Sequence, residues 1–143
     1  MHGGRGRWQQ CGFQIKRGID VDDLIHILTL KLAAVWMKLS LPEGFAECSL
    51  LRLFGCYNGV GAQWMPQRMR RLLTEWFSFL AAASLIHDYE FTFLPKSYWN
   101  FTKANLRLAY NAAKSGKLLT GSAAAVICQL FGWSAYKPGK EGT

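Results

Sequence analysis

The sequence predicts a small, mainly α-helical domain. The chain has 143 residues, a length that suits one domain with its own hydrophobic core. Half of the residues are hydrophobic and 18% are charged, so the composition excludes a disordered chain and a coiled coil. Apolar residues recur mostly at helical spacing, and no segment has the pattern of a long strand. We therefore expect helices packed around one core.

The amino-terminal part divides into an arm and a helix. Residues 1–18 are glycine-rich and basic, which predicts a flexible arm ahead of a single domain over residues 19–143. The first helix is expected to begin after Asp20 and to end before Pro42, because the apolar side chains between them follow helical spacing.

Three acidic residues open this helix, namely Asp20, Asp22 and Asp23. Carboxylates grouped in this way are one pattern of a metal site. The positive end of the helix macrodipole also favours acidic residues, and needs no metal to do so. We favour this second interpretation.

A glycine-rich stretch, FGCYNGVGAQWMP, runs from Phe54 to Pro66 and is expected to be a loop. Gly55, Gly59 and Gly61 fall within seven residues. Glycine adopts backbone conformations that other residues avoid, and it lets the backbone come close to a ligand. The stretch is therefore either an ordinary connection or a ligand-binding loop.

Three further helices are expected over residues 67–91, 98–115 and 121–130. A short loop around Pro95 separates the first two, and Gly116 is a natural end for the second. The third is rich in alanine and is expected to pack closely. Residues 118–136 carry no charge and approach the length of a membrane span, but glycine and polar residues dilute them, so we do not favour a span.

Charge and cysteine content narrow the possible environments. The chain has 17 Lys and Arg against 9 Asp and Glu, a net charge of +8 that favours an anionic partner. Its four cysteines form no CxxC pair, which indicates neither a zinc site nor a disulfide framework and suits a reducing compartment. No apolar run follows the basic amino end until Leu24, so we expect no signal peptide and synthesis in the cytoplasm.

Two short motifs resemble the two halves of the phospholipase A2 site. The calcium loop of that family reads aromatic-Gly-Cys-Tyr-Cys-Gly-x-Gly-Gly and then reaches a proline. Residues 54–62 read Phe-Gly-Cys-Tyr-Asn-Gly-Val-Gly-Ala, and Pro66 follows. The active-site helix of the family reads Cys-Cys-x-x-His-Asp-x-Cys-Tyr, and residues 83–91 read Ala-Ser-Leu-Ile-His-Asp-Tyr-Glu-Phe.

The resemblance is closest to the disulfide-free forms encoded by bacteria and their phages. Several cysteines of the family are replaced together, at Asn58, Ala83, Ser84 and Glu90. Cys56 remains, and we interpret it as a small packed residue. The resemblance also supplies the hypothesis that the protein is delivered in a phage particle.

The resemblance implies a helical phospholipase A2-like domain with a glycine-rich calcium loop between helices, and a calcium-dependent hydrolase acting on a glycerophospholipid ester. Backbone carbonyls of Tyr57, Gly59 and Gly61 and the carboxylate of Asp88 would bind Ca²⁺. His87 would take a proton from the attacking water. The Gly59 N–H would help calcium to stabilise the oxyanion.

One role of the family is filled differently. The family holds the second histidine nitrogen with an aspartate on a neighbouring helix, but residues 98–115 contain no Asp or Glu. The resemblance makes Asn105 the nearest candidate, with Tyr110 as another member of the network. Asparagine can accept the imidazole N–H but adds no charge to stabilise an imidazolium. A non-catalytic descendant that acts as a virion structural or interaction protein is therefore the alternative function.

Basic residues near the expected loop predict a membrane-binding surface, formed by Trp64, Arg68, Arg70 and Arg71. Anionic membranes attract basic residues by about 1 kcal/mol each, and tryptophan favours the interface. A solvated surface over core aromatics is the alternative. The expected partner is a phospholipid membrane surface, and the second candidate is a virion protein or another protein. Nucleic acid is the least favoured partner, since the chain shows no recognised nucleic-acid motif. The oligomeric state stays open.

Overall fold

The computed structural model describes residues 19–57, 66, 68 and 80–136, and helices are the only regular secondary structure among these residues. They are α1 (Val21–Trp36), α2 (Leu50–Cys56), α4 (Ala81–Phe93), α5 (Tyr98–Lys114), α6 (Leu118–Phe131) and the short α7 (Trp133–Tyr136). The mainly helical fold class is confirmed. The expected arm over residues 1–18 and most of the expected calcium loop lie outside the described residues.

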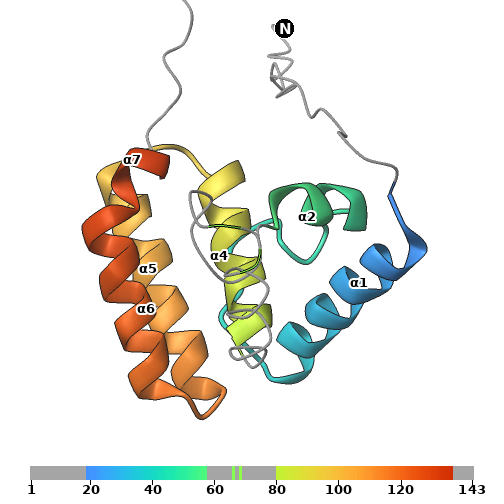
Figure 1. The fold of residues 1–143 in the computed structure, drawn as a ribbon, viewed down its shortest axis with the longest axis horizontal. Coiled ribbons are helices and arrows are strands. Elements are labelled where there is room, and N and C mark those ends of the chain that lie inside the picture. The colour runs from blue at the N-terminus through green and yellow to red at the C-terminus, as the bar shows by residue number, and fades with distance from the viewer. Residues whose placement is uncertain (1–18, 58–65, 67, 69–79, 137–143) are drawn as a thin grey trace, which may run out of the picture.

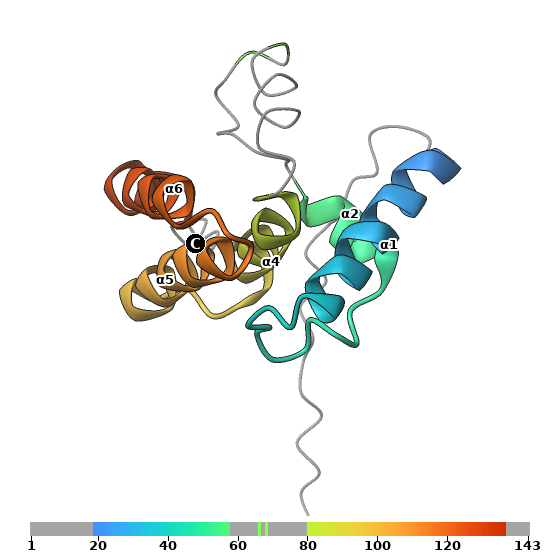
Figure 2. The same cartoon turned by 90° about the horizontal axis from the view of Figure 1, so that it is seen from below.

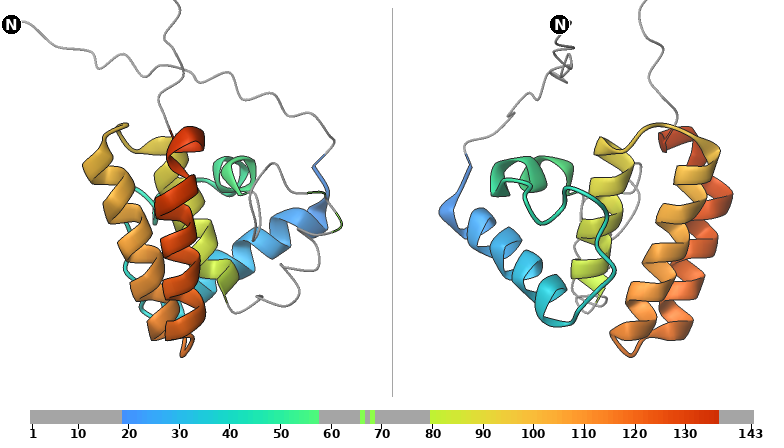
Figure 3. Two further views of the ribbon diagram at one scale, coloured as in Figure 1. Left: turned by 60° about the vertical axis from the view of Figure 1, so that its left-hand side comes forward. Right: turned by 180° about the vertical axis from the view of Figure 1, so that it is seen from behind.

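Helix α4 lies between two groups of helices (Figure 1, Figure 2). On one side α5 packs along α4, and α6 packs along α5. On the other side α1 and α2 contact each other and α4. Two further views show the same division (Figure 3). Side chains on different faces of α4 therefore meet different surroundings.

The ends of α1 follow from local capping. The Asp20 carboxylate caps the helix by accepting the N–H of Asp22 at 3.4 Å. Asp22 and Asp23 lie in the first turn, where the macrodipole favours acidic residues. The helix ends at Trp36 because Lys38 adopts a φ of 52°. The N–H groups of Lys38 and Leu39 then bond back to carbonyls of the last turn, which is the pattern of a Schellman motif.

Helix α2 corrects the expected start of the glycine-rich loop. Ser49 caps this helix, and its hydroxyl accepts the N–H of Arg52 at 3.4 Å. The helix continues to Cys56, so residues 54–56 are helical although the sequence predicted a loop there. Leu53 and Cys56 lie three positions apart and are both buried in the core. This burial outweighs the low helix propensity of Gly55.

The later helices begin and end close to their expected limits. Helix α5 starts at Tyr98 as predicted and is closed by Gly116, whose φ is 77°. Helix α6 starts at Leu118, ahead of the expected Gly121. Helix α4 (Ala81–Phe93) forms the last part of the helix expected over residues 67–91 and continues two residues beyond it. Residues 67 and 69–79 of that expected helix lie outside the described residues. Over the part of the chain that is described, no helix has the length and apolar character needed to cross a bilayer.

Close packing joins α5 to α6, as the small residues of α6 predicted. A Cβ atom placed on Gly121 would lie 2.0 Å from the Cβ of Ala112, so only glycine fits at this crossing. Asn111 is completely buried and connects α5 to the turn after α1. Its Oδ1 accepts the Ser40 N–H at 2.7 Å, and its Nδ2 donates to the Ser40 carbonyl at 3.0 Å.

The main hydrophobic core lies between α4 and the pair formed by α1 and α2. Its buried members come from α1, from the turn after it, from α2 and from one face of α4. They are Ile27, Leu30, Ala34, Leu39, Phe45, Cys48, Leu53, Cys56, Ala81, Ala82, Leu85, Ile86 and Tyr89. The opposite side of α4 is thereby left to face α5 and α6.

Candidate active site

His87 lies on α4 in a buried position, where its side chain turns toward α5. The residue is 7% exposed, and its ring stacks on Phe91 one turn later, with 4.1 Å between the ring centroids. Asp88 follows directly, so the two side chains leave the helix about 100° apart. The pair thus presents an imidazole and a carboxylate to adjoining parts of the molecule.

A chain of hydrogen bonds holds the imidazole. The Nε2 atom of His87 lies 2.8 Å from Oδ1 of Asn105, a residue of α5 that is itself buried. The Nδ2 group of Asn105 donates to Oε1 of Gln129 on α6 at 2.7 Å. The Nε2 group of Gln129 donates in turn to the hydroxyls of Tyr98 at 3.2 Å and Thr102 at 3.3 Å. Three helices therefore contribute to the position of His87.

This chain of bonds selects a protonation state. In the orientation that the structure gives the two amide groups, Oδ1 of Asn105 only accepts, so His87 carries its proton on Nε2 and keeps a lone pair on Nδ1. Burial lowers the pKa of His87 to about 4, and the hydrogen bond to Asn105 offsets only part of this effect. The imidazole is neutral at pH 7 and can accept a proton through Nδ1.

Asp88 lies beside this lone pair. Its Oδ1 is 4.0 Å from Nδ1 of His87, which is too far for a direct hydrogen bond, and its side chain is 16% exposed. Burial first and the Asp88 carboxylate second raise the pKa of Tyr57 to about 12 and that of Cys128 to about 11. Burial first and the Asp88 carboxylate second also raise the pKa of Cys56, to about 12. The carboxylate therefore lies near side chains of α2 and α6 as well.

The expected calcium ligands are described only in part. The structure includes Tyr57 and Asp88, whereas Gly59 and Gly61 lie outside the described residues. Asp88 offers a hard carboxylate oxygen, and Tyr57, within the expected loop, offers a backbone carbonyl, so both donor types fit Ca²⁺. Within the described ranges, no group of three or more His, Cys, Asp or Glu residues is able to hold a metal ion. A calcium ion at Asp88 would accordingly take most of its ligands from backbone carbonyls and water.

The remaining site predictions have mixed outcomes. Tyr110 is 53% exposed, and the Lys114 ammonium lies 5.4 Å above its ring, so this tyrosine is not part of the hydrogen-bonded chain at His87. Arg68 is exposed, which is compatible with a surface role. The other members of the expected membrane surface, Trp64, Arg70 and Arg71, and the proposed oxyanion donor Gly59 lie outside the described residues.

Gln129 is the member of the network that sequence analysis missed. It lies 24 positions from Asn105, and no local spacing relates the two residues. The available signal is weak, because Gln129 is merely the longest polar side chain in an otherwise small and apolar helix. Comparisons of the chain with protein-family models, curated proteins and solved structures found no match.

Proposed function

We propose that this chain is a phospholipase A2-like hydrolase that cleaves a glycerophospholipid ester with a water molecule activated by His87. One observation carries the proposal. His87 and Asn105, which are 18 positions apart and which the motif resemblance assigned to the same site, meet at 2.8 Å between buried side chains. The arrangement leaves Nδ1 of the imidazole as the available base.

The residues of this chain divide the work as follows. Nδ1 of His87 takes the proton of the attacking water and returns it to the leaving alcohol oxygen. Asn105 keeps Nε2 protonated and the ring in place, and Gln129 fixes the Asn105 amide. Calcium, when held by Asp88 and the carbonyls of Tyr57, Gly59 and Gly61, would supply positive charge for the oxyanion.

The proposed substrate surface is an anionic phospholipid membrane. The net charge of +8 and the exposed Arg68 support this partner, because basic side chains are attracted to anionic lipid. Synthesis in the cytoplasm followed by delivery in a phage particle belongs to the same proposal. Its test is immunodetection of the protein in purified particles, and absence from them would contradict delivery.

A second candidate function is a non-catalytic virion structural or interaction protein with the same fold. The observation that favours it is the neutral partner of His87. Asn105 offers no charge to stabilise an imidazolium, and burial disfavours that ion further by lowering the pKa of His87 to about 4. Both features oppose the charged state through which a histidine base must pass.

A calcium titration of fatty-acid release from mixed anionic vesicles separates the two functions. For the enzyme, we expect calcium-dependent release that His87→Gln and Asp88→Asn both abolish. Asp23→Asn is the matched control for Asp88→Asn, because Asp23 is exposed in the first turn of α1 and lies outside the hydrogen-bonded chain. A folded wild-type protein without turnover at millimolar calcium would contradict the hydrolase and support the non-catalytic role.

A further inference from the structure

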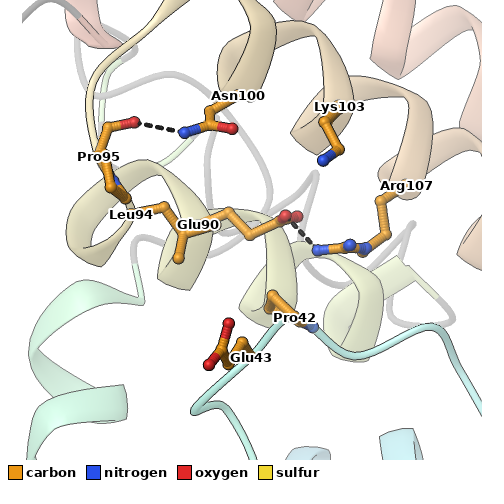
Figure 4. A pocket seen from close by; sticks show the side chains of 8 residues that line it. All are labelled: Pro42, Glu43, Glu90, Leu94, Pro95, Asn100, Lys103 and Arg107. Carbon is orange, nitrogen blue, oxygen red and sulfur yellow. Dashed lines mark hydrogen bonds and ion pairs between the residues drawn. The ribbon is translucent and has the colours of Figure 1, made fainter.

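A pocket of about 320 Å³ lies at one end of α4, apart from the His87 network. The turn after α1, the end of α4 and the part of α5 from Asn100 to Arg107 form its walls (Figure 4). Its lining residues are Pro42, Glu43, Glu90, Leu94, Pro95, Asn100, Lys103 and Arg107. None of them takes part in the hydrogen bonds that hold the imidazole. Its volume is near the lower limit of small-molecule sites.

The side chain of Glu90 in this pocket has an unsatisfied carboxylate oxygen. This side chain is buried, with only 3% of the residue exposed, and Oε1 accepts a hydrogen bond from Nη1 of Arg107. The second oxygen, Oε2, is buried without any hydrogen-bond partner. Burial raises the pKa of Glu90 to about 7, even though Arg107 and Lys103 both act to lower it. An unpaired buried carboxylate oxygen is costly, and a donor placed in the pocket would remove that cost.

The other charges define what kind of donor fits. Arg107 is paired with Glu90, which leaves Glu43 on one wall and Lys103 on the other (Figure 4). Nδ2 of Asn100 donates to the Pro95 carbonyl at 2.9 Å, so the amide oxygen of Asn100 remains available as an acceptor. The pocket thus offers acceptors around Glu90 and Glu43 and an ammonium donor at Lys103.

Simple ions match this arrangement poorly. A metal cation would leave the Lys103 ammonium on the other wall without an anionic partner in the pocket. A simple anion would be repelled by Glu43 and would leave Oε2 without a donor. A ligand that carries both charges can place its positive group beside Glu43 and its negative group beside Lys103.

We propose that this pocket binds a small zwitterion with a primary ammonium and an anionic group a few bonds apart. The ammonium donates to Oε2 of Glu90 and lies beside Glu43, while the anionic group accepts a hydrogen bond from Lys103. Free phosphoethanolamine has this chemistry, and so does the phosphoethanolamine headgroup of a lipid. The proposal does not depend on hydrolysis at His87.

The test is isothermal titration calorimetry on the full chain with phosphoethanolamine, ethanolamine and inorganic phosphate. We expect phosphoethanolamine to bind at least about tenfold more tightly than either half, since only the whole molecule satisfies both walls. Equal affinity for one half, or no heat with millimolar phosphoethanolamine, would overturn the proposal. Vesicles with and without phosphatidylethanolamine, at equal anionic lipid content, identify the source. Tighter binding to the former indicates the lipid headgroup, and binding of the free compound alone indicates a soluble ligand.

Matched variants locate the binding. Lys103→Ala and Glu43→Gln change exposed side chains, and each should weaken phosphoethanolamine binding about tenfold. Lys114→Ala on the same helix and Glu47→Gln in the same turn as Glu43 lie outside the pocket and should leave the affinity unchanged. Glu90→Gln should abolish binding, with circular dichroism to confirm its fold. Binding that persists in both Lys103→Ala and Glu43→Gln would refute this site.

Discussion

Oδ1 of Asn105 on α5 lies 2.8 Å from Nε2 of His87 on α4, and the Asn105 side chain is uncharged. The contact fixes which nitrogen of the imidazole is free, while burial keeps the ring neutral. The basicity of His87 is therefore set first by burial, which lowers its pKa, and second by the hydrogen bond to Asn105, which acts to raise it.

The first prediction is that Asn105→Asp raises the pKa of His87 by roughly one to three units, because a carboxylate stabilises the imidazolium. Gln129 can turn its amide to donate to the new carboxylate, and the hydroxyls of Tyr98 and Thr102 can donate as well as accept. NMR titration of the His87 ring measures the shift.

Asn105→Leu is the control for this prediction, since it removes the hydrogen bond that acts to raise the pKa of His87. Its titration should move to lower pH than that of the wild type. If the Asp and Leu variants titrate together, the contact does not set the basicity of His87. In the hydrolase, Asn105→Asp should also increase the rate of fatty-acid release.

The second prediction concerns acid stability. The pKa of His87 is about 4 in the folded chain, below the ordinary value of 6.5, so the unfolded chain binds more protons between these values. The contribution of His87 to the free energy of unfolding is complete above pH 6.5 and is lost as the pH falls toward 4. Its upper limit is about 3 kcal/mol.

Urea unfolding at a series of pH values tests this effect by comparing the free energies of unfolding of the wild type and His87→Gln. His87→Gln should show a flatter loss of stability than the wild type between about pH 6.5 and pH 4, because glutamine does not titrate. Equal slopes for the two proteins would contradict the lowered pKa of His87.

The third prediction is that Asn111→Ala lowers the free energy of unfolding by about 2 to 4 kcal/mol. The substitution leaves both the N–H and the carbonyl of Ser40 without their partners, and it opens a cavity at a fully buried position. Asn100→Ala is the matched control, because it removes one exposed bond to a backbone carbonyl. Chemical denaturation should show a cost for it of about 1 kcal/mol or less.

The fourth prediction tests the contact between α5 and α6. Gly121→Val should destabilise the chain by roughly 1 to 3 kcal/mol, since its Cβ would overlap Ala112. Ala123→Val introduces the same side chain at an exposed position of the same helix and should change stability by less than about 0.5 kcal/mol. Thermal unfolding of the two variants measures the difference, and similar midpoints would show that the helices do not approach so closely.

Local signals were sufficient to predict several helices. The periodic apolar residues and the acidic residues ahead of them predicted α1, and Gly116 marked the end of α5. These signals act within about one turn of the chain, so the neighbouring sequence contains all of them. The start of the glycine-rich loop was wrong because burial of Leu53 and Cys56, which no local rule includes, extends α2 to Cys56.

The sequence by itself determined the helical class and the chemical types at the candidate site, which are the adjacent His87 and Asp88 and an amide at Asn105 where the resemblance expects a carboxylate. Tertiary structure alone decided their partners. Gln129 reaches Asn105, and Arg107 reaches Glu90, because α5 packs against both α4 and α6. A hydrogen bond between residues 24 positions apart depends on how helices pack, and packing is a property of the whole core.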